Sequence, residues 1–476
     1  MVVQHGRPLC VWGWADPGEA VTVGLGEQSG SASAGSDGKW RITLPPLPPG
    51  GPLTMTVRGN NRLEVTDILA GDVWICCGQS NMEMPVGNLY RPKPYPGVLN
   101  FREEIARASH PQIRLFLPDH QTSLNPKDDL PGKGWQVCTP ESAGRFSAVG
   151  YFFARHLHAS LKVPIGMIQA AKSSTPAEAW TSLEGLRTIP QWAARLDKRK
   201  PASSHPPMPA APADTPDPDN PPPPTTVEVP FGEPAGLFNG MIAPATPFVI
   251  RGAIFYQGEN NAKDPRGYSV LFPTLIRSWR NAWGLGDFPF LFVQLAAYGP
   301  KPRQPREDGG WAAQREAQAA ALKEPNTGMA VTIDIGSPNL IHPPNKQEVG
   351  RRLGLLAESI AYGRTVEARG PSFHSMKAEG GALRIRFDHT AGGLVAKPLT
   401  RGTPPTLPIR PTGFVIAGRD GTYHPADAQI CGDEVVLSSP DVPQPVAARY
   451  AWAGNPDCNL YNSANLPAEP FRAESR

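Results

Sequence analysis

Cysteine, long apolar runs and net charge are all scarce in this sequence of 476 residues. The six cysteines form no C-x-x-C pair, and Cys76 and Cys77 are adjacent, so the sequence indicates neither a disulfide framework nor a zinc site. No stretch approaches the roughly 18 to 20 uncharged apolar residues that a membrane helix needs. The 46 basic and 43 acidic residues leave a net charge of only +3, too little to attract a polyanion. We therefore expect no membrane, nucleic-acid or metal partner.

Proline and glycine are abundant by contrast, with 57 and 48 residues. Because both residues interrupt regular structure, the sequence predicts many turns and several long loops. Hydrophobic residues make up 40% of the chain, which is enough to build a sizeable core and excludes a globally disordered protein. At roughly 100 to 200 residues per domain, the length allows two to four domains.

The hydrophobic pattern divides the chain into three parts. Residues 1–70 alternate apolar and polar side chains in short runs separated by Gly- and Pro-containing turns, which predicts an N-terminal β domain. Residues 71–368 alternate apolar strands with amphipathic helices, which predicts a parallel α/β sheet flanked by helices. Short alternating strands return in residues 369–476 and predict a C-terminal antiparallel β region. The strands expected in the middle part are Val73–Cys76, Val163–Ala170, Phe248–Tyr256, Phe288–Leu295 and Met329–Ile335, and the helices are Tyr268–Trp283, Gln314–Leu322 and Asn345–Tyr362.

Residues 200–230 form a proline-rich insertion inside the α/β part. This segment has almost no apolar residue to bury, so it is expected to be an irregular surface loop. The simpler interpretation is a passive connection. Its place within the α/β part leaves a lid over the site as the alternative.

The most informative local feature is a buried strand that runs into Gly78-Gln79-Ser80-Asn81. A serine at the carboxyl end of a parallel strand lies at the edge where such sheets bind ligands. If a helix follows, its unpaired N–H groups can stabilise a developing oxyanion. Ser80 is therefore a candidate nucleophile, and the competing interpretation is that it only caps the helix.

Two further polar clusters follow later strands. The strand ending at Tyr256 leads into Gln257-Gly258-Glu259-Asn260-Asn261, where amides can donate to an oxyanion and a carboxylate can orient a histidine. His342 lies in a loop after the last strand and before a helix, so it can reach the same edge of the sheet. The alternative for the block from Gln257 to Asn261 is a polar turn with a helix cap. The alternative for His342 is a purely structural role.

Together these three blocks resemble the sialate O-acetylesterase family, a carbohydrate-esterase branch of the SGNH hydrolases. The resemblance extends beyond the site and covers nearly the whole chain. The blocks that carry it are Gly78-Gln79-Ser80-Asn81, Tyr256-Gln257-Gly258-Glu259, His342-Pro343-x-Asn345-Lys346, Trp135–Cys138, Phe146–Phe153, Phe238–Pro244 and Arg449–Trp452. The implied fold is an SGNH-hydrolase-like α/β domain, and the implied activity is serine-dependent hydrolysis of acetyl esters on sugars.

The resemblance implies that Ser80 attacks the acetyl carbonyl while His342 accepts its proton. Candidate donors for the oxyanion are Ser174 through its N–H, and Gln257 and Asn261 through their side chains. No metal or organic cofactor is implied.

Two departures from the family pattern affect this site. Lys172-Ser173-Ser174-Thr175 stands where family members usually have Trp-Gly-Gly-Thr, and a serine would be strained there if the backbone needs a positive φ. The aspartate that the wider superfamily places three residues before its histidine is missing. Glu259 is the favoured acid to orient His342, with Asp334 or a main-chain carbonyl near Asn339 as alternatives.

The expected function is thus an O-acetylesterase acting on acetylated mono-, oligo- or polysaccharides through an acetyl-enzyme intermediate. A catalytically impaired carbohydrate-binding protein with the same fold is the main alternative, and a serine peptidase is a third. The opening Val2–Pro8 resembles the middle of a first family strand that normally follows a secretion signal, so a periplasmic or secreted location is expected, with the cytoplasm as the alternative. The acetylated sugar and the oligomeric state are left open.

Overall fold

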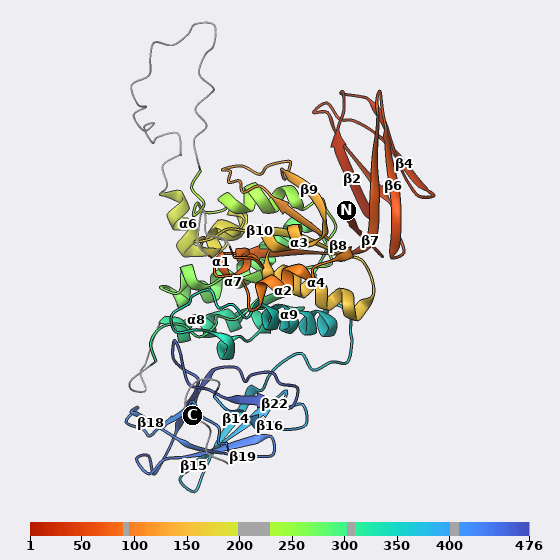
Figure 1. The fold of residues 1–476 in the computed structure, drawn as a ribbon. Helices are drawn as coiled ribbons and strands as arrows, with labels where there is room; N and C mark the ends of the chain where they lie inside the picture. Colours follow the sequence, from red (N-terminus) through yellow and green to blue (C-terminus); the bar gives the residue numbers. More distant parts are fainter. Residues whose placement is uncertain (89–94, 199–228, 302–309, 400–408, 476) are drawn as a thin grey trace, which may run out of the picture.

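The structure is a computed structural model that describes residues 1–88, 95–198, 229–301, 310–399 and 409–475. Figure 1 shows a helix-covered central sheet with β strands at both ends of the molecule. This confirms the predicted α/β class with antiparallel N- and C-terminal β regions. Of the proline-rich insertion predicted at residues 200–230, residues 200–228 lie outside the described residues. Within the described ranges, no helix combines the length and the apolar character that crossing a membrane requires.

The N-terminal β part is joined to the central sheet by one long strand, β7. The first half of β7 pairs with β6 and β1, and the second half pairs with β10 and β11 in the central sheet. The predicted boundary at residue 70 therefore falls within β7, and the division into three domains stays a prediction. The strands of this part are β1 (Val2–Gln4), β2 (Leu9–Trp14), β3 (Ala20–Leu25), β4 (Gln28–Ser33), β5 (Lys39–Leu44), β6 (Gly50–Arg58) and β7 (Arg62–Gly78).

The central sheet has the strand order β13-β12-β11-β7-β10-β8-β9, and every pair is parallel except β8 with β9. β7 lies in the middle, so the ends of β7, β10 and β11 meet at one edge. The strands that follow β7 are β8 (His110–Pro118), β9 (Gly132–Cys138), β10 (Ile165–Ala171), β11 (Gly252–Tyr256), β12 (Phe290–Val293) and β13 (Thr327–Ala330). The last predicted strand is shorter than expected, because residues 333–335 form a 3₁₀ turn.

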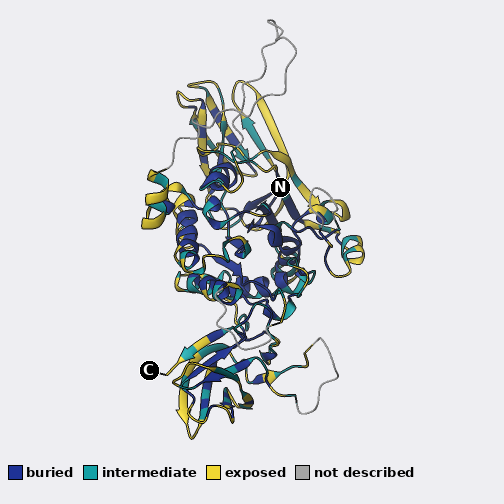
Figure 2. Ribbon diagram, turned by 90° about the vertical axis from the view of Figure 1, so that its left-hand side faces the viewer, coloured by how far each residue is buried: buried dark blue, intermediate teal, exposed yellow. Residues whose placement is uncertain are grey.

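Helices cover both faces of this sheet, as its apolar strands require. Successive side chains of a strand point to opposite faces, so Val73 and Ile75 join the core under α7 while Trp74 and Cys76 join the core under α4 and α9. Figure 2 shows these buried layers in the middle of the molecule. The helices are α1 (Ser80–Glu83), α2 (Phe101–Ala106), α3 (Pro140–Arg145), α4 (Ala148–Leu161), α5 (Leu183–Arg187), α6 (Pro190–Asp197), α7 (Pro265–Trp283), α8 (Gly310–Ala319) and α9 (Lys346–Ile360).

The C-terminal β part contains two four-stranded antiparallel sheets, β14-β15-β20-β19 and β18-β17-β21-β23, and the pair β16-β22. Its apolar residues, including Leu383 and Phe414, belong to the same core cluster as the α7 side of the central sheet. The strands are β14 (Ser372–Glu379), β15 (Ala382–Asp388), β16 (Leu394–Ala396), β17 (Phe414–Ala417), β18 (Tyr423–Pro425), β19 (Asp427–Cys431), β20 (Glu434–Ser438), β21 (Ala447–Tyr450), β22 (Leu460–Asn462) and β23 (Phe471–Glu474).

Candidate active site

Ser80 is the first residue of the short helix α1, directly after β7. The turn between them depends on Gly78, whose φ is 134° and whose missing Cβ would lie 2.1 Å from the carbonyl oxygen of Tyr256. A glycine is therefore required where the chain leaves the sheet. The turn brings Ser80 to the carboxyl edge of the sheet, where its side chain is largely buried at 8% exposure.

The Glu259 block lies beside the Ser80 block because β7 and β11 are neighbours. Gly78 pairs with Tyr256 in the strand register, and the Gln79 N–H donates to the Tyr256 carbonyl at 3.0 Å. The Asn260 N–H in turn donates to the Gln79 side-chain oxygen at 3.2 Å. The structure thus brings together the first two of the three blocks that the sequence singles out.

Asn81 connects these blocks to the histidine loop. Its Nδ2 donates to the Glu259 carboxylate at 2.5 Å and to the Ile341 carbonyl at 3.0 Å, one residue before His342. Its Oδ1 accepts a hydrogen bond from Lys346 Nζ at 2.5 Å. The residue next to the candidate nucleophile therefore holds both sides of the loop that carries the candidate base.

His342 itself is half-buried and packs edge-on against Tyr95, with 5.2 Å between the ring centroids. The Tyr95 hydroxyl lies 2.5 Å from Ser173 Oγ and donates to the Glu83 carboxylate at 3.2 Å. The Ser173 N–H also donates to Glu83, at 2.7 Å. Tyr95 thus fixes one side of the imidazole and connects it to the loop after β10.

Two titratable groups of opposite sign meet at Asn81 in this network: Lys346 is buried, and Glu259 is a half-buried residue with one enclosed carboxylate oxygen. Burial raises the pKa of Glu259, and the hydrogen bond from Asn81 opposes that change. Burial lowers the pKa of Lys346 to about 7, against the attraction of Glu259. Lys346 is fully buried and also lies over the Tyr256 ring, 5.1 Å from its centroid. The Lys346 ammonium and the Glu259 carboxylate attract each other, so removal of either charge would leave the other uncompensated.

Ser174 has a left-handed backbone, with φ at 61°. The sequence predicts strain for a serine here if the backbone has a positive φ, and this φ meets that condition. The Ser174 carbonyl accepts a hydrogen bond from Asn260 Nδ2 at 3.0 Å, so the loop after β10 is bound to the β11 block. Ser174 therefore lies next to the Gln79–Asn260 contact.

The side chains of Gln257 and Asn261 form a framework behind this edge. Gln257 Nε2 donates to Asn261 Oδ1 at 2.6 Å and to the Thr175 carbonyl at 3.3 Å. Asn261 Oδ1 also accepts from the Ala177 N–H, and its Nδ2 donates to Glu178. Since these amide hydrogens already have acceptors, an oxyanion would have to compete with them.

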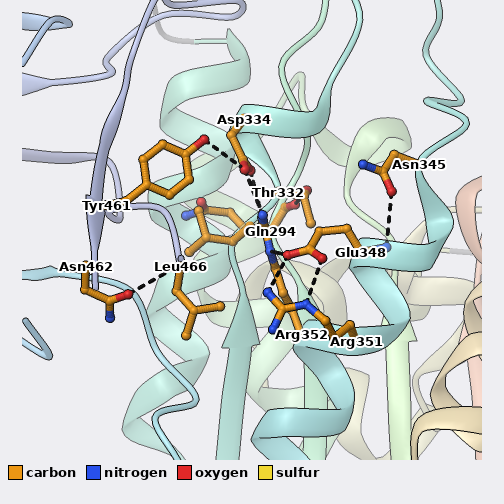
Figure 3. Close-up of polar contacts among 11 residues, drawn as sticks. Gln294, Thr332, Asp334, Asn345, Glu348, Arg351, Arg352, Tyr461, Asn462 and Leu466 are labelled. Atoms are coloured by element: carbon orange, nitrogen blue, oxygen red, sulfur yellow. Dashed lines mark hydrogen bonds and ion pairs between the residues drawn. The ribbon is translucent and has the colours of Figure 1, made fainter. Parts of the chain in front are cut away.

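Asp334, the alternative acid, is already engaged by two other side chains. Both of its carboxylate oxygens accept from Arg352 at 2.7 Å, and the Tyr461 hydroxyl donates to it at 3.1 Å. Figure 3 shows Arg352 between Asp334 and Glu348, and Tyr461 approaching from the C-terminal β part. Through Asp334, Arg352 of α9 is therefore connected to Tyr461 of the C-terminal β part.

Asn81 and Lys346 belong to the sequence motifs, but the motifs predict no role for either residue, and Tyr95 lies outside all of them. A lysine in a His-Pro-x-Asn-Lys block is ordinarily a solvated residue at the start of a helix, so its complete burial could not be expected. In the described part of the chain, no group of three or more His, Cys, Asp or Glu side chains is arranged to hold a metal ion.

Comparison with known proteins gives concordant matches. A family model described as a sialic acid-specific acetylesterase among the carbohydrate esterases matches residues 231–356. The chain is 30% identical to the sialate O-acetylesterase of Mus musculus over 98% of this chain and 90% of that protein, and 32% identical to that of Homo sapiens over 97% and 88%. It aligns with a solved carbohydrate acetylesterase from Xanthomonas citri at 35% identity and a TM-score of 0.82, covering 100% of this chain and 97% of that one.

Proposed function

The chain belongs to the sialate O-acetylesterase family and is a carbohydrate O-acetylesterase, and on this premise we propose that Ser80, His342 and Glu259 form its catalytic site. The observation that carries the proposal is the Asn81 side chain, which joins the residue after Ser80 to Glu259 and to the carbonyl before His342. Three segments far apart in the sequence thereby share one buried site.

In the proposed reaction, Ser80 Oγ attacks the acetyl carbonyl carbon and its proton passes to His342. The tetrahedral intermediate expels the sugar oxygen, which takes that proton from His342. A water molecule then attacks the acetyl-serine, again giving a proton to His342, and acetate leaves as Ser80 regains its hydrogen. The Ser174 N–H is the proposed donor to the oxyanion.

Glu259 acts in this proposal as the acid that orients the histidine. Its negative charge favours the imidazolium that forms at His342, and its hydrogen bond to Asn81 holds the Ile341 carbonyl and thus the loop. Gln257 and Asn261 are proposed to support the oxyanion site by holding the loop after β10, since their amides bond to Thr175 and Ala177 there.

The substrate is an acetylated carbohydrate, and we propose that it includes oligosaccharides or polysaccharides as well as free sugars. Acetylated polysaccharides are polymers of the cell exterior, which supports a periplasmic or secreted location. Assay of the activity in fractionated cells of the source organism tests that location.

Acetate release from a panel of acetylated glycans tests the catalytic assignment. We expect the wild type to release acetate, and Ser80→Ala and His342→Ala each to lose roughly a thousandfold or more in kcat while remaining folded. The double variant should be no worse than the single ones, because the pair acts as one unit. Retention of a tenth of the activity by Ser80→Ala would remove it from the nucleophile's role.

A further inference from the structure

Residues of α6, α7 and α8 line two hollows. Figure 1 shows these three helices on one flank of the molecule. The first, of about 640 Å³, is walled by Trp192 of α6 and by Val270 of α7. The second, of about 600 Å³, lies between α8 and the C-terminal β part and is walled by Trp452. Lys263 and Arg266 line both hollows, so the two hollows adjoin along these residues, and together they are here called the Trp192–Trp452 groove.

The groove adjoins the candidate catalytic site through Asn260. Asn260 lines the first hollow, and its N–H donates to the side chain of Gln79, the residue before Ser80. Its Nδ2 donates to the carbonyl of Ser174. A ligand in the first hollow would therefore contact Asn260. This residue is hydrogen-bonded to Gln79, the neighbour of Ser80, and to Ser174, the proposed oxyanion donor.

The size and walls of the groove fit sugar units. An acetyl group occupies only a small part of either hollow, because ligand pockets of several hundred Å³ match molecules of drug size. Trp192 and Trp452 are both half-buried, and each indole is held on one face by a guanidinium, that of Arg195 over Trp192 and that of Arg472 over Trp452. Indole rings of this kind can cover the C–H faces of sugars, while the polar groups nearby meet their hydroxyls.

The ridge between the two hollows carries positive charge. Lys263 and Arg266 are exposed, and neither has an ion-pair partner among the described residues. Of the acidic neighbours, Glu316 forms an ion pair with Arg472 at 2.8 Å, whereas the exposed Asp264 accepts from the Gly267 N–H and keeps its negative charge, so Lys263, Asp264 and Arg266 together leave one excess positive charge on the ridge. This excess positive charge beside the path of a glycan favours a ligand that bears carboxylates.

We propose that the Trp192–Trp452 groove binds the sugar units that flank the acetylated one in a carboxylate-bearing oligosaccharide or polysaccharide. This inference rests on the proposed function, because the groove is assigned as an extension of the Ser80 site. The two tryptophans supply contact with the sugar faces, and Lys263 and Arg266 attract uronate carboxylates at the ridge.

The test compares three esters: acetylated glucuronoxylan oligosaccharides, the same oligosaccharides after reduction of their carboxyl groups, and 4-nitrophenyl acetate. We measure kcat/KM on each and take the ratio of the oligosaccharide value to the 4-nitrophenyl acetate value. The double variants Trp192→Ala/Trp452→Ala and Lys263→Glu/Arg266→Glu should each lower the ratio for the acidic oligosaccharide by about tenfold or more. The charge variant should have less effect on the reduced oligosaccharide, and added salt should lower the wild-type ratio on the acidic one.

Matched controls lie in the N-terminal β part. Trp14, which is 52% exposed, provides Trp14→Ala, and the exposed Arg41 and Arg58 provide a double charge reversal to Glu. Ratios that are the same in the groove variants and the controls would overturn the inference, as would equal wild-type ratios on acidic and reduced oligosaccharides. Failure of the proposed function would look different: the wild type would then release acetate from no acetylated sugar at all, or Ser80→Ala would remain active.

Discussion

Ser174 combines a side chain with a left-handed backbone at a position where the family usually has glycine. A non-glycine residue in that conformation costs about 1 kcal/mol or more, part of which is offset by the greater freedom of glycine in the unfolded chain. We predict that Ser174→Gly raises the free energy of unfolding by about 0.5 to 1 kcal/mol. Because the N–H is kept, kcat should change by less than about threefold. Denaturant unfolding and ester turnover measure the two quantities.

Ser173→Gly is the matched control for this prediction. The Ser173 side chain is bonded to Tyr95 and Glu83, so its removal should lower the free energy of unfolding by about 1 kcal/mol. The account of strain at Ser174 would fail if Ser174→Gly were also destabilising.

A substitution at Glu259 tests whether catalysis needs the negative charge of this side chain or only its hydrogen bond from Asn81. Glu259→Gln keeps a side-chain oxygen for Asn81 but removes the negative charge. If that charge orients His342 and stabilises its imidazolium, kcat should fall by roughly two to four orders of magnitude, with the fold retained. Steady-state kinetics and circular dichroism make the measurement.

Asp334→Asn is the comparison for Glu259. Since Asp334 forms an ion pair with buried Arg352, its substitution should mainly lower stability. A loss of less than about fivefold in folded Glu259→Gln would contradict the proposed role. A Ser80–His342 dyad held by a main-chain carbonyl would then be the better account.

At the scale of elements, α9 is the helix that positions the histidine loop. Its first residue is Lys346, its N-terminal cap is Asn345, and Arg352 in its second turn bonds to Asp334 and Glu348. The Tyr461 hydroxyl from β22 completes this cluster. The C-terminal β part is therefore connected by hydrogen bonds to the helix that follows His342 (Figure 3).

We predict that Tyr461→Phe lowers the free energy of unfolding by about 1.5 to 3 kcal/mol, because it removes a hydrogen bond to a buried carboxylate. Denaturant unfolding gives the value. Tyr298→Phe is the control, since the Tyr298 ring packs on Trp311 but its hydroxyl has no hydrogen-bond partner in the described part of the chain. Equal effects of the two substitutions would show that the Tyr461–Asp334 bond is not stabilising.

At the scale of the whole molecule, Lys346 makes stability depend on pH. Its pKa is about 7 in the folded protein and near its ordinary value of 10.5 in the unfolded chain. Between these values the unfolded chain binds more protons, so this group makes stability rise with pH across that window. Glu259 acts in the opposite sense above pH 4.5, because its pKa is raised by folding.

We predict that the difference in free energy of unfolding, wild type minus Lys346→Met, increases by up to about 1.4 kcal/mol per pH unit above pH 7. Urea unfolding at several pH values between about 6.5 and 9.5 measures it. The exposed Lys323→Met should give a difference that does not vary with pH. A difference that falls as pH rises would contradict the burial of Lys346 as a source of its altered pKa.

The sequence alone determined the three-part order, the parallel sheet and the candidate residues at strand ends. These follow from local patterns, because the alternation of apolar strands with helices sets the class and each polar block lies directly after its strand. From these patterns the sequence predicts that Ser80, Glu259 and His342 lie at one edge of the sheet. At Ser174 the sequence predicts strain only on the condition that φ is positive, and the structure supplies that φ.

Only the tertiary structure decided which partners these residues meet. Asn81 bonds to Glu259, Ile341 and Lys346, which lie 178, 260 and 265 positions away in the chain. Such pairings depend on strand order, on register and on the packing of α9, and no local pattern encodes them. The same holds for the amides of Gln257 and Asn261, whose hydrogen bonds go to the framework behind the site. A side chain's type follows from the sequence, but its burial and partners are set by which distant segments the shared core brings beside it.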